Sequence, residues 1–319
     1  MLLSRFVVSI FPVALMVVSA GVVFSQNYPN KPIRLVTSQP GGGSDFTARI
    51  IAQGISGPLG QPVIVDNRVN IAAIEVSMKA PPDGYTLFFG ASSFIYGPLL
   101  REMFYDPLRD FLPVSAATTS PSVLAVNPSL PAASVRELIA LAKAKPGVLN
   151  YASTGVGSGS HLAAALFTSM AGVNIVHVPY KSTGPAFTDL ISGQVQFMIP
   201  TAASVVPHLK TRRLKALAIT TEQPSALFPG VPTVTAAGLP GYVSVSTNGV
   251  YAPAKTPAAI INRLNQEIVR VLSNADVKQK FFDSGSDTDP TSPAEFTAKI
   301  TSEISRLSKV IKEAGIRAE

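Results

Sequence analysis

The turn at residues 41–45 combines residue types that suit anion binding. It lies between an apolar strand-like run, residues 32–38, and a helix-like run that begins at Phe46. Glycine lets a ligand approach the backbone closely, and the first turn of a helix presents unpaired N–H groups at the positive end of its dipole. We therefore predict an anion pocket formed by Gly41, Gly42, Gly43, Ser44 and Asp45. The alternative is a tight turn in which Ser44 or Asp45 caps the helix, and capping and ligand binding can coexist.

A second turn rich in glycine and hydroxyl residues also lies between a strand-like and a helix-like run. Its candidate ligand-binding residues are Ser153, Thr154, Gly155, Gly157, Ser158 and His161. Backbone N–H groups beside serine and threonine hydroxyls are donors from which a carboxylate accepts hydrogen bonds. His161 lies in the first turn of its helix, where packing explains it equally well. Two such turns in one chain are harder to explain as accidents than one.

Tyr180 and Lys181 form a third candidate, at the end of a strand-like run and ahead of another helix. A tyrosine hydroxyl and a lysine charge can both hold an acidic ligand. The alternative for Lys181 is a solvated position, which is where loop lysines usually lie.

The sequence lacks the short motifs of several enzyme and cofactor classes. G-x-G-x-x-G would need a glycine at Phe46, and neither G-x-S-x-G nor H-E-x-x-H occurs. The chain has no cysteine, which excludes disulfides and thiolate metal sites. We therefore expect neither an enzyme nor a bound metal or cofactor. An exported serine hydrolase remains the alternative, because catalytic triads assemble from distant residues.

The N-terminal residues have the pattern of an export signal. Arg5 precedes an apolar stretch at residues 6–24, and we expect cleavage after Ser25, with cleavage after Ala20 as the second option. An uncleaved membrane anchor is the alternative, because about 20 apolar residues can span a bilayer. We expect residues 1–25 to be the signal peptide and the mature protein to be periplasmic.

The chain carries a formal net charge of +7, although only 14% of its residues are charged. Outside the cytoplasm, a basic protein can steer acidic small molecules toward itself. The basic residues are dispersed, and the densest cluster, residues 210–215, leads directly into a strand-like run. We therefore do not expect nucleic-acid binding.

Short β-type runs alternate with helix-type runs, which is typical of an α/β protein with largely parallel sheets. The runs form two blocks, joined by extended stretches at residues 110–128 and 242–253. We predict a two-lobed clamshell with two crossover strands, in which residues 26–122 and 249–319 form lobe 1 and residues 123–248 form lobe 2. Ligands bind such sheets at the carboxyl ends of strands, so the cleft between the lobes is the expected site.

Helices are expected from Phe46, from near Ile71, and at residues 134–145, 159–171, 184–192, 257–273, 275–283 and 292–314. The last begins with a capping pattern, Ser292 followed by Glu295. The C-terminal segment is expected to pack back onto lobe 1.

Several collinear segments carry a family resemblance: Y-P-N-K-P-I-R-L-V from Tyr28, P-G-G-G-S-D from Pro40, L-G-Q-P-V-I-V-D-N-R from Leu59, A-P-P-D-G-Y-T-L from Ala80, N-Y-A-S-T-G-V-G-S-G-S-H-L from Asn150, V-P-Y-K-S-T-G-P-A from Val178, L-K-A-L-A-I-T from Leu214 and Y-A-P-A-K-T-P from Tyr251. From about Tyr28 to its C-terminus the chain resembles the substrate-binding proteins of tripartite tricarboxylate transporters, the Bug family. The resemblance implies a type II periplasmic-binding-protein fold that closes on a small carboxylated molecule and delivers it to a two-component permease. It also implies that the turn at residues 41–45 and the segment after the next strand hold the ligand carboxylate.

Three places depart from the usual family pattern. After Asn67-Arg68 the family usually continues P-G-A-G-G-N-I-G, whereas residues 69–74 read V-N-I-A-A-I and lack the glycines that permit close backbone approach. Pro200 replaces a common acidic residue, and Thr247-Asn248 replaces a common aromatic pair. These changes are consistent with a more acidic ligand or with another ligand class, so tricarboxylate specificity is not carried over.

We therefore expect a monomeric periplasmic receptor that captures a small organic anion between its lobes and passes it to the permease subunits of a tripartite transporter. A solute receptor that signals to a membrane sensor is the further alternative.

Overall fold

The computed structural model describes residues 28–41, 43–313 and 316 of the 319-residue chain. The expected signal peptide and both expected cleavage points lie outside the described residues, as does Gly42. None of the helices within the described ranges is both long enough and apolar enough to cross a membrane.

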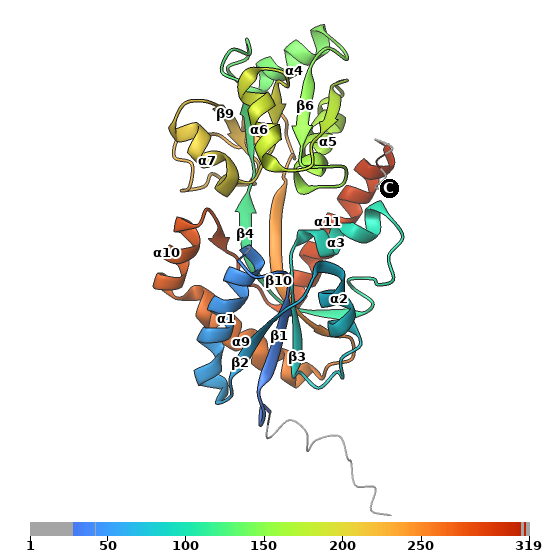
Figure 1. Cartoon of the computed structure of the whole chain (residues 1–319), viewed down its shortest axis with the longest axis vertical. Coiled ribbons are helices and arrows are strands. Elements are labelled where there is room, and N and C mark those ends of the chain that lie inside the picture. The colour runs from blue at the N-terminus through green and yellow to red at the C-terminus, as the bar shows by residue number, and fades with distance from the viewer. Residues whose placement is uncertain (1–27, 42, 314–315, 317–319) are drawn as a thin grey trace, which may run out of the picture.

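Two β-sheets, each covered by helices, form two lobes (Figure 1). The first sheet contains β1 (Ile33–Thr37), β2 (Val63–Asn67), β3 (Thr86–Gly90), β4 (Phe111–Pro121), β10 (Val245–Pro253) and β11 (Asp287–Thr288). The second contains β5 (Val123–Val126), β6 (Asn150–Ser153), β7 (Val176–Pro179), β8 (Phe197–Met198) and β9 (Lys215–Ile219). The strand orders are β2-β1-β3-β10-β4-β11 and β7-β6-β8-β5-β9. The fourth strand of each order, β10 or β5, runs antiparallel to both of its neighbours. This arrangement confirms the predicted two-lobed α/β fold.

The helices follow the sequence prediction in most places. The first lobe carries α1 (Gly43–Leu59), α2 (Asn70–Met78), α3 (Ser92–Leu100), α9 (Ala258–Ser273), α10 (Ala275–Asp283) and α11 (Pro293–Glu313). The second carries α4 (Val135–Ala144), α5 (Gly159–Ala171), α6 (Thr183–Ser192), α7 (Ala202–Lys210) and α8 (Val234–Ala237). Helices α5 and α10 have the predicted bounds, whereas α1 begins three residues before the predicted start at Phe46. Neither α3 nor α7 is predicted, because each has only nine residues and contains a proline, Pro98 or Pro207.

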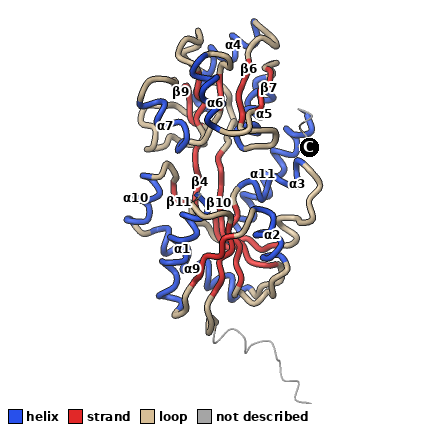
Figure 2. The backbone as a smooth tube through the Cα atoms, viewed as in Figure 1, coloured by secondary structure: helices blue, strands red, loops and turns tan. Residues whose placement is uncertain are grey.

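Two strands cross between the lobes, as the sequence predicts (Figures 1 and 2). Strand β4 leads into β5 through Ser122, and β10 runs antiparallel beside β4. Thr220 joins the two crossings, because its N–H and hydroxyl donate to Ser122 O, each at 3.0 Å, and its carbonyl accepts from Ser244 N at 2.9 Å. The two crossing segments are therefore hydrogen-bonded to each other through Thr220. The lobe boundary predicted between residues 248 and 249 falls inside β10.

The C-terminal helices pack on the first lobe, as predicted, and α11 also reaches the second. Helix α9 packs against α1 and β4, and α11 packs against α3 and β4. Farther along α11, Leu307 and Ile311 share a hydrophobic cluster with Leu162 of α5, and Val310 joins the core of the second lobe. Helix α11 therefore contacts both lobes.

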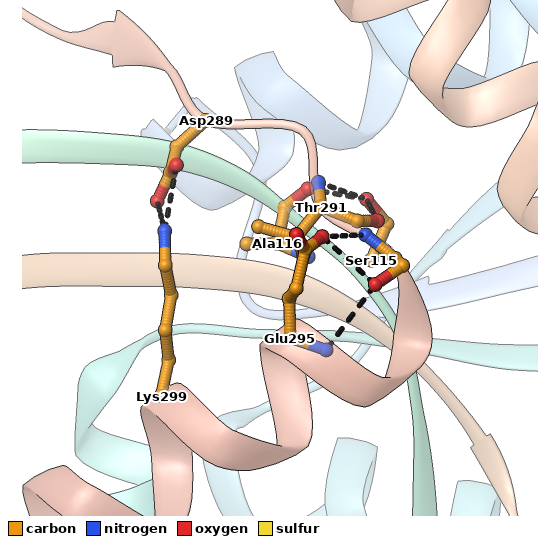
Figure 3. A network of polar contacts seen from close by, with 7 residues as sticks. Ser115, Ala116, Asp289, Thr291, Glu295 and Lys299 are labelled. Atoms are coloured by element: carbon orange, nitrogen blue, oxygen red, sulfur yellow. Dashed lines mark hydrogen bonds and ion pairs between the residues drawn. The ribbon is translucent and has the colours of Figure 1, made fainter.

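Hydrogen bonds fix the start of α11 on β4 (Figure 3). Thr291 Oγ1 accepts from Ala116 N at 3.0 Å, and Ser115 Oγ donates to Thr291 O at 3.1 Å. The predicted capping pattern is confirmed, because Glu295 N donates to Ser292 Oγ at 3.2 Å while Glu295 Oε2 accepts from Ser292 N at 2.9 Å. The anchored first turn determines where the later turns of α11 lie.

Candidate functional site

A cavity of about 360 Å³ lies between the two lobes. On the first-lobe side its wall includes Ala91, Ser92 and Ser93 at the start of α3. On the second-lobe side, the segments at the starts of α5, α6 and α7 contribute Gly157, Ser158, Ser160, Thr183, Thr201 and Ser204. Each of these helices follows a strand of its own sheet. The cavity therefore has the position at strand ends where ligands bind α/β sheets.

Three of the helix starts around this cavity have no capping side chain. In the described structure the side chains of Ala91 at α3, Ser182 at α6 and Thr201 at α7 accept no hydrogen bond from a backbone N–H of the first turn. At α5, by contrast, Ser158 Oγ accepts from His161 N at 3.2 Å. An uncapped helix start leaves first-turn N–H groups for solvent or a ligand, and the helix dipole adds positive potential. These helix starts make the cavity suitable for an anion.

Helix α11 adds two charged side chains to the cavity wall, Glu303 and Arg306. Tyr96 OH donates to Glu303 Oε1 at 2.6 Å, and Arg306 Nη2 lies 3.6 Å from the same oxygen. Arg306 Nη1 donates to Val243 O. Burial raises the pKa of Glu303 above its usual value, although Tyr96 and Arg306 oppose that shift. Arg306 therefore brings a partly neutralised positive charge to the cavity.

The first predicted turn is held by Asp45, which is only 5% exposed. Gly41 N donates to Asp45 Oδ2 at 2.9 Å, and Asn67 Nδ2 donates to Oδ1 at 2.9 Å. Arg49 Nε lies 3.0 Å from the same Oδ1. Burial alone would raise the pKa of Asp45, but hydrogen bonds from Arg49, Gly41 and Asn67 outweigh it and hold this pKa below its usual value. The carboxylate therefore braces the turn against the end of β2.

The other described residues of this turn lie apart from the 360 Å³ cavity. Gly41 has a φ of +81°, a conformation that favours glycine, and a Cβ at Gly43 would meet open space. Ser44 lines an adjoining pocket of about 300 Å³. The predicted contact role of this turn therefore stays a prediction.

The second predicted turn divides into cavity-lining residues and supporting residues. Thr154, Gly157 and Ser158 line the cavity. Ser153, Gly155 and His161 do not, and Ser153 is fully buried. Gly157 N donates to His161 Nδ1 at 2.9 Å, which ties the turn to α5.

His161 is held as a neutral ring. It stacks on His177 with 3.9 Å between ring centroids, and the Nε2 of His177 lies 2.7 Å from Ser153 Oγ. Burial, with a smaller contribution from His177, lowers the pKa of His161 to about 4. Because Nδ1 accepts the hydrogen bond from Gly157 N, the remaining proton of the neutral ring is on Nε2.

Tyr180 and Lys181 do not line the cavity, although Thr183 of the same segment does. Tyr180 OH donates to Asp189 Oδ2 at 2.7 Å, and burial together with Asp189 raises the pKa of Tyr180 to about 12. Lys181 is exposed.

A serine hydrolase would need an accessible serine beside a histidine. In the part of the chain that the structure describes, neither Ser44 nor Ser158 shares a hydrogen bond with a histidine ring, and Ser153, which pairs with His177, is fully buried. No group of three or more His, Asp or Glu side chains is placed to hold a metal ion within the same ranges.

Several cavity residues are absent from the sequence prediction. The segments Ala91 to Ser93 and Thr201 to Ser204 follow strand-like runs just as the predicted turns do, so the same rule could have identified them. Glu303 and Arg306 have no local signal, because they enter the wall through the packing of α11.

Comparison with known proteins places this fold in a family. Residues 47–316 match the tripartite tricarboxylate transporter family receptor, TctC. BugT of Bordetella pertussis is 34% identical, and the match covers 96% of this chain and 97% of that protein.

Solved relatives have the same fold, and two of them hold a carboxylate. A structure from R. palustris with adipate is 36% identical, covers 91% of this chain and 99% of its own, and has a TM-score of 0.73. MatC of Rhodopseudomonas palustris with bound malate is 29% identical, covers 89% and 100%, and has a TM-score of 0.70. Other solved relatives are periplasmic proteins. The chain therefore has the periplasmic-binding-protein fold and belongs to the tripartite tricarboxylate transporter receptor family, together with BugT, as a binding protein rather than an enzyme.

Proposed function

We propose that this chain is a periplasmic receptor that captures a small organic anion bearing a carboxylate in the cavity between its lobes. The observation that carries the proposal is the convergence of uncapped helix starts from both lobes on one hydroxyl-lined cavity. The adipate and malate complexes of relatives support a carboxylate as the anion.

The contact residues proposed for the anion come from both lobes. Thr154, Gly157 and Ser158 supply hydroxyl and backbone donors from the second lobe, and Ser93 supplies a hydroxyl from the first. Arg306 can add a charge-assisted hydrogen bond. The remaining predicted residues around these turns, including Asp45 and His161, are proposed to hold the turns in place.

The delivery step is proposed from the family alone. The loaded receptor would pass its ligand to the permease of a tripartite tricarboxylate transporter. Lobe closure would bend the junction at Ser122 and Thr220, because both crossing segments meet there. Export through a cleavable signal at residues 1–25 and action as a monomer complete the proposal.

Calorimetric titration of residues 26–319 with adipate, malate and citrate tests the proposal. We expect saturable binding of at least one carboxylate, and Arg306→Gln should weaken it roughly ten- to hundredfold because it removes a hydrogen bond to a charged group. Arg109→Gln is the matched control, because Arg109 is exposed, pairs with Asp110 and does not line the cavity. Absence of binding by all three acids would contradict carboxylate capture.

Thr154→Val is a second, independent test, because it removes a proposed second-lobe hydroxyl donor and none of the hydrogen bonds of α11. Loss of affinity in both variants, with thermal stability preserved, would support the assigned cavity. Unchanged affinity in both would place the ligand elsewhere.

A further inference from the structure

The cavity between the lobes contains an acidic side chain as well as a basic one. Among the described residues that line it, Glu303 is the one carboxylate and Arg306 the one cation. Both belong to α11, and Arg306 Nη2 lies 3.6 Å from Glu303 Oε1. A carboxylate in the wall of an anion site repels the charge of the ligand. Anion capture alone therefore does not account for Glu303.

The two carboxylate oxygens of Glu303 differ in their partners. Oε1 accepts from Tyr96 OH at 2.6 Å and lies beside Arg306 Nη2. Within the described residues, no hydrogen bond or ion pair reaches Oε2. Lys299, one turn earlier on α11, is already engaged, because its Nζ donates to both carboxylate oxygens of Asp289 at 2.8 Å. A carboxylate can accept about four hydrogen bonds, so Glu303 keeps unused acceptor capacity at Oε2.

The Oε2 atom of Glu303 is also accessible. In the described parts of the chain, no side-chain oxygen or nitrogen is both fully buried and without a partner, so the unpartnered Oε2 reaches open space. Besides the cavity of about 360 Å³, Glu303 lines a space of about 10 Å³. That smaller space holds about one water molecule at most. A ligand group therefore reaches this carboxylate from the cavity between the lobes.

We propose that Glu303 is a specificity-determining residue, whose carboxylate accepts a hydrogen bond from a hydroxyl or ammonium group on the ligand carbon next to the captured carboxylate. This inference rests on the proposed function, in which Arg306 binds that ligand carboxylate. The spacing fits, because a substituent one or two bonds from a carboxylate on Arg306 lies close to Glu303, 3.6 Å away. The receptor then selects a 2-hydroxy or 2-amino acid over the unsubstituted acid.

The preference arises from what happens to an acid that lacks the donor. In the open cavity, water can donate to Glu303 Oε2. A ligand that fills the cavity displaces this water, and an unsubstituted acid puts no donor in its place. An acceptor that loses its donor on binding costs its full desolvation, which is large for a charged group. Sites built to hydrogen-bond a ligand group reject the analogue without it for this reason.

Calorimetry with succinate, malate and aspartate measures this preference, because the three acids differ at C2 only, where they carry hydrogen, hydroxyl or ammonium. Propionate, lactate and alanine form the same series without the second carboxylate. In at least one series, the hydroxy acid or the amino acid should bind at least about tenfold more tightly than the unsubstituted acid. The tighter of the two identifies the donor as a hydroxyl or as an ammonium group.

Glu303→Met removes both acceptor oxygens and keeps the length of the side chain. The preference should fall below about twofold, and the unsubstituted acid should bind at least as tightly as before, because the repelling charge is gone. Glu303→Asp keeps the charge but withdraws the acceptor by one methylene, so it should lower the preference in part and tests the same contact if Glu303→Met does not fold. Glu313→Met is the matched control on α11, because Glu313 is exposed and does not line the cavity.

The results separate this inference from the proposed function. Equal affinities within both series of the wild-type protein would overturn the inference. Equal weakening of all acids in Glu303→Met would also overturn it, because Glu303 would then only hold Arg306 in place. Binding of adipate, which has no such donor, but of none of the six acids would do the same. In each of these cases carboxylate capture stands, whereas the absence of binding by every carboxylate would end both proposals.

Discussion

Replacing Asp45 tests whether the first glycine turn is braced by this carboxylate or uses it to hold a ligand. Asp45→Ala removes the acceptor for Gly41 N and Asn67 Nδ2, both at 2.9 Å, and the partner of Arg49. Asn67 keeps its second hydrogen bond, from Nδ2 to Ser38 O at 2.7 Å, so the end of β2 remains partly tied. The main loss is therefore the connection between the turn and β2.

The expected loss of stability follows from these contacts. The hydrogen bonds from Gly41 N and Asn67 Nδ2 reach a charged, buried acceptor and contribute about 1.5–3 kcal/mol each. The ion pair with Arg49 adds little, because the Arg49 side chain is 55% exposed. Removing the carboxylate also removes its desolvation cost, which leaves a net loss of about 2–4 kcal/mol.

Urea unfolding at pH 7 measures this loss in Asp45→Ala, in Asn67→Ala and in the double variant. We expect non-additivity of about 1–2 kcal/mol, because Asp45 and Asn67 share a hydrogen bond. Glu75→Ala is the control, since it breaks only a surface pair with Lys79 and should cost less than about 0.5 kcal/mol. If Asp45→Ala lowers the free energy of unfolding by less than about 1 kcal/mol and abolishes ligand binding, then Asp45 does not stabilise the turn and is a ligand contact instead.

The contribution of Asp45 to the stability of the fold has a defined pH dependence. The pKa of Asp45 is lower in the folded protein than its usual 3.8. A lowered carboxyl pKa contributes stability that is present above about pH 4 and is lost as the pH falls through the folded pKa. The stability gap between wild type and Asp45→Asn should therefore be constant near pH 7 and shrink below about pH 4.

Three further predictions concern the surrounding structure. Tyr180→Phe should lower stability by about 1 kcal/mol without changing ligand affinity in calorimetry, because its hydroxyl binds Asp189 and not the cavity. Gly249→Ala should cost about 3 kcal/mol in urea unfolding, because its Cβ would lie 2.3 Å from Phe296 Cζ; a loss below 1 kcal/mol would contradict that packing. The pKa of His161 is lowered to about 4 from 6.5, so wild-type stability should fall as the pH drops from about 6.5 to 4, and His161→Gln should flatten this slope.

The fold was largely predictable because its signals are local. Short apolar runs, turn residues and caps each act within a few residues, and α4, α5 and α10 begin and end at such signals. The start of α1 was not predicted, because helix propensity disfavours glycine and yet Gly43 lies in the first turn. The start of α2 at Asn70 agrees with the helix predicted from near Ile71, and the two alanines of that segment favour helix.

The site was only partly predictable, because residues that bind an anion and residues that brace a turn are of the same types. Asp45 and Ser158 each lie in a glycine-rich turn at the start of a helix, but only Ser158 lines the cavity. What separates them is the partner: the carboxylate of Asp45 is occupied by Asn67, which is 22 residues away in the sequence. A local pattern shows which groups can donate or accept hydrogen bonds. Only the packed chain shows which groups are already occupied, and among the described helices around the cavity the starts of α3, α6 and α7 are those without a side-chain cap.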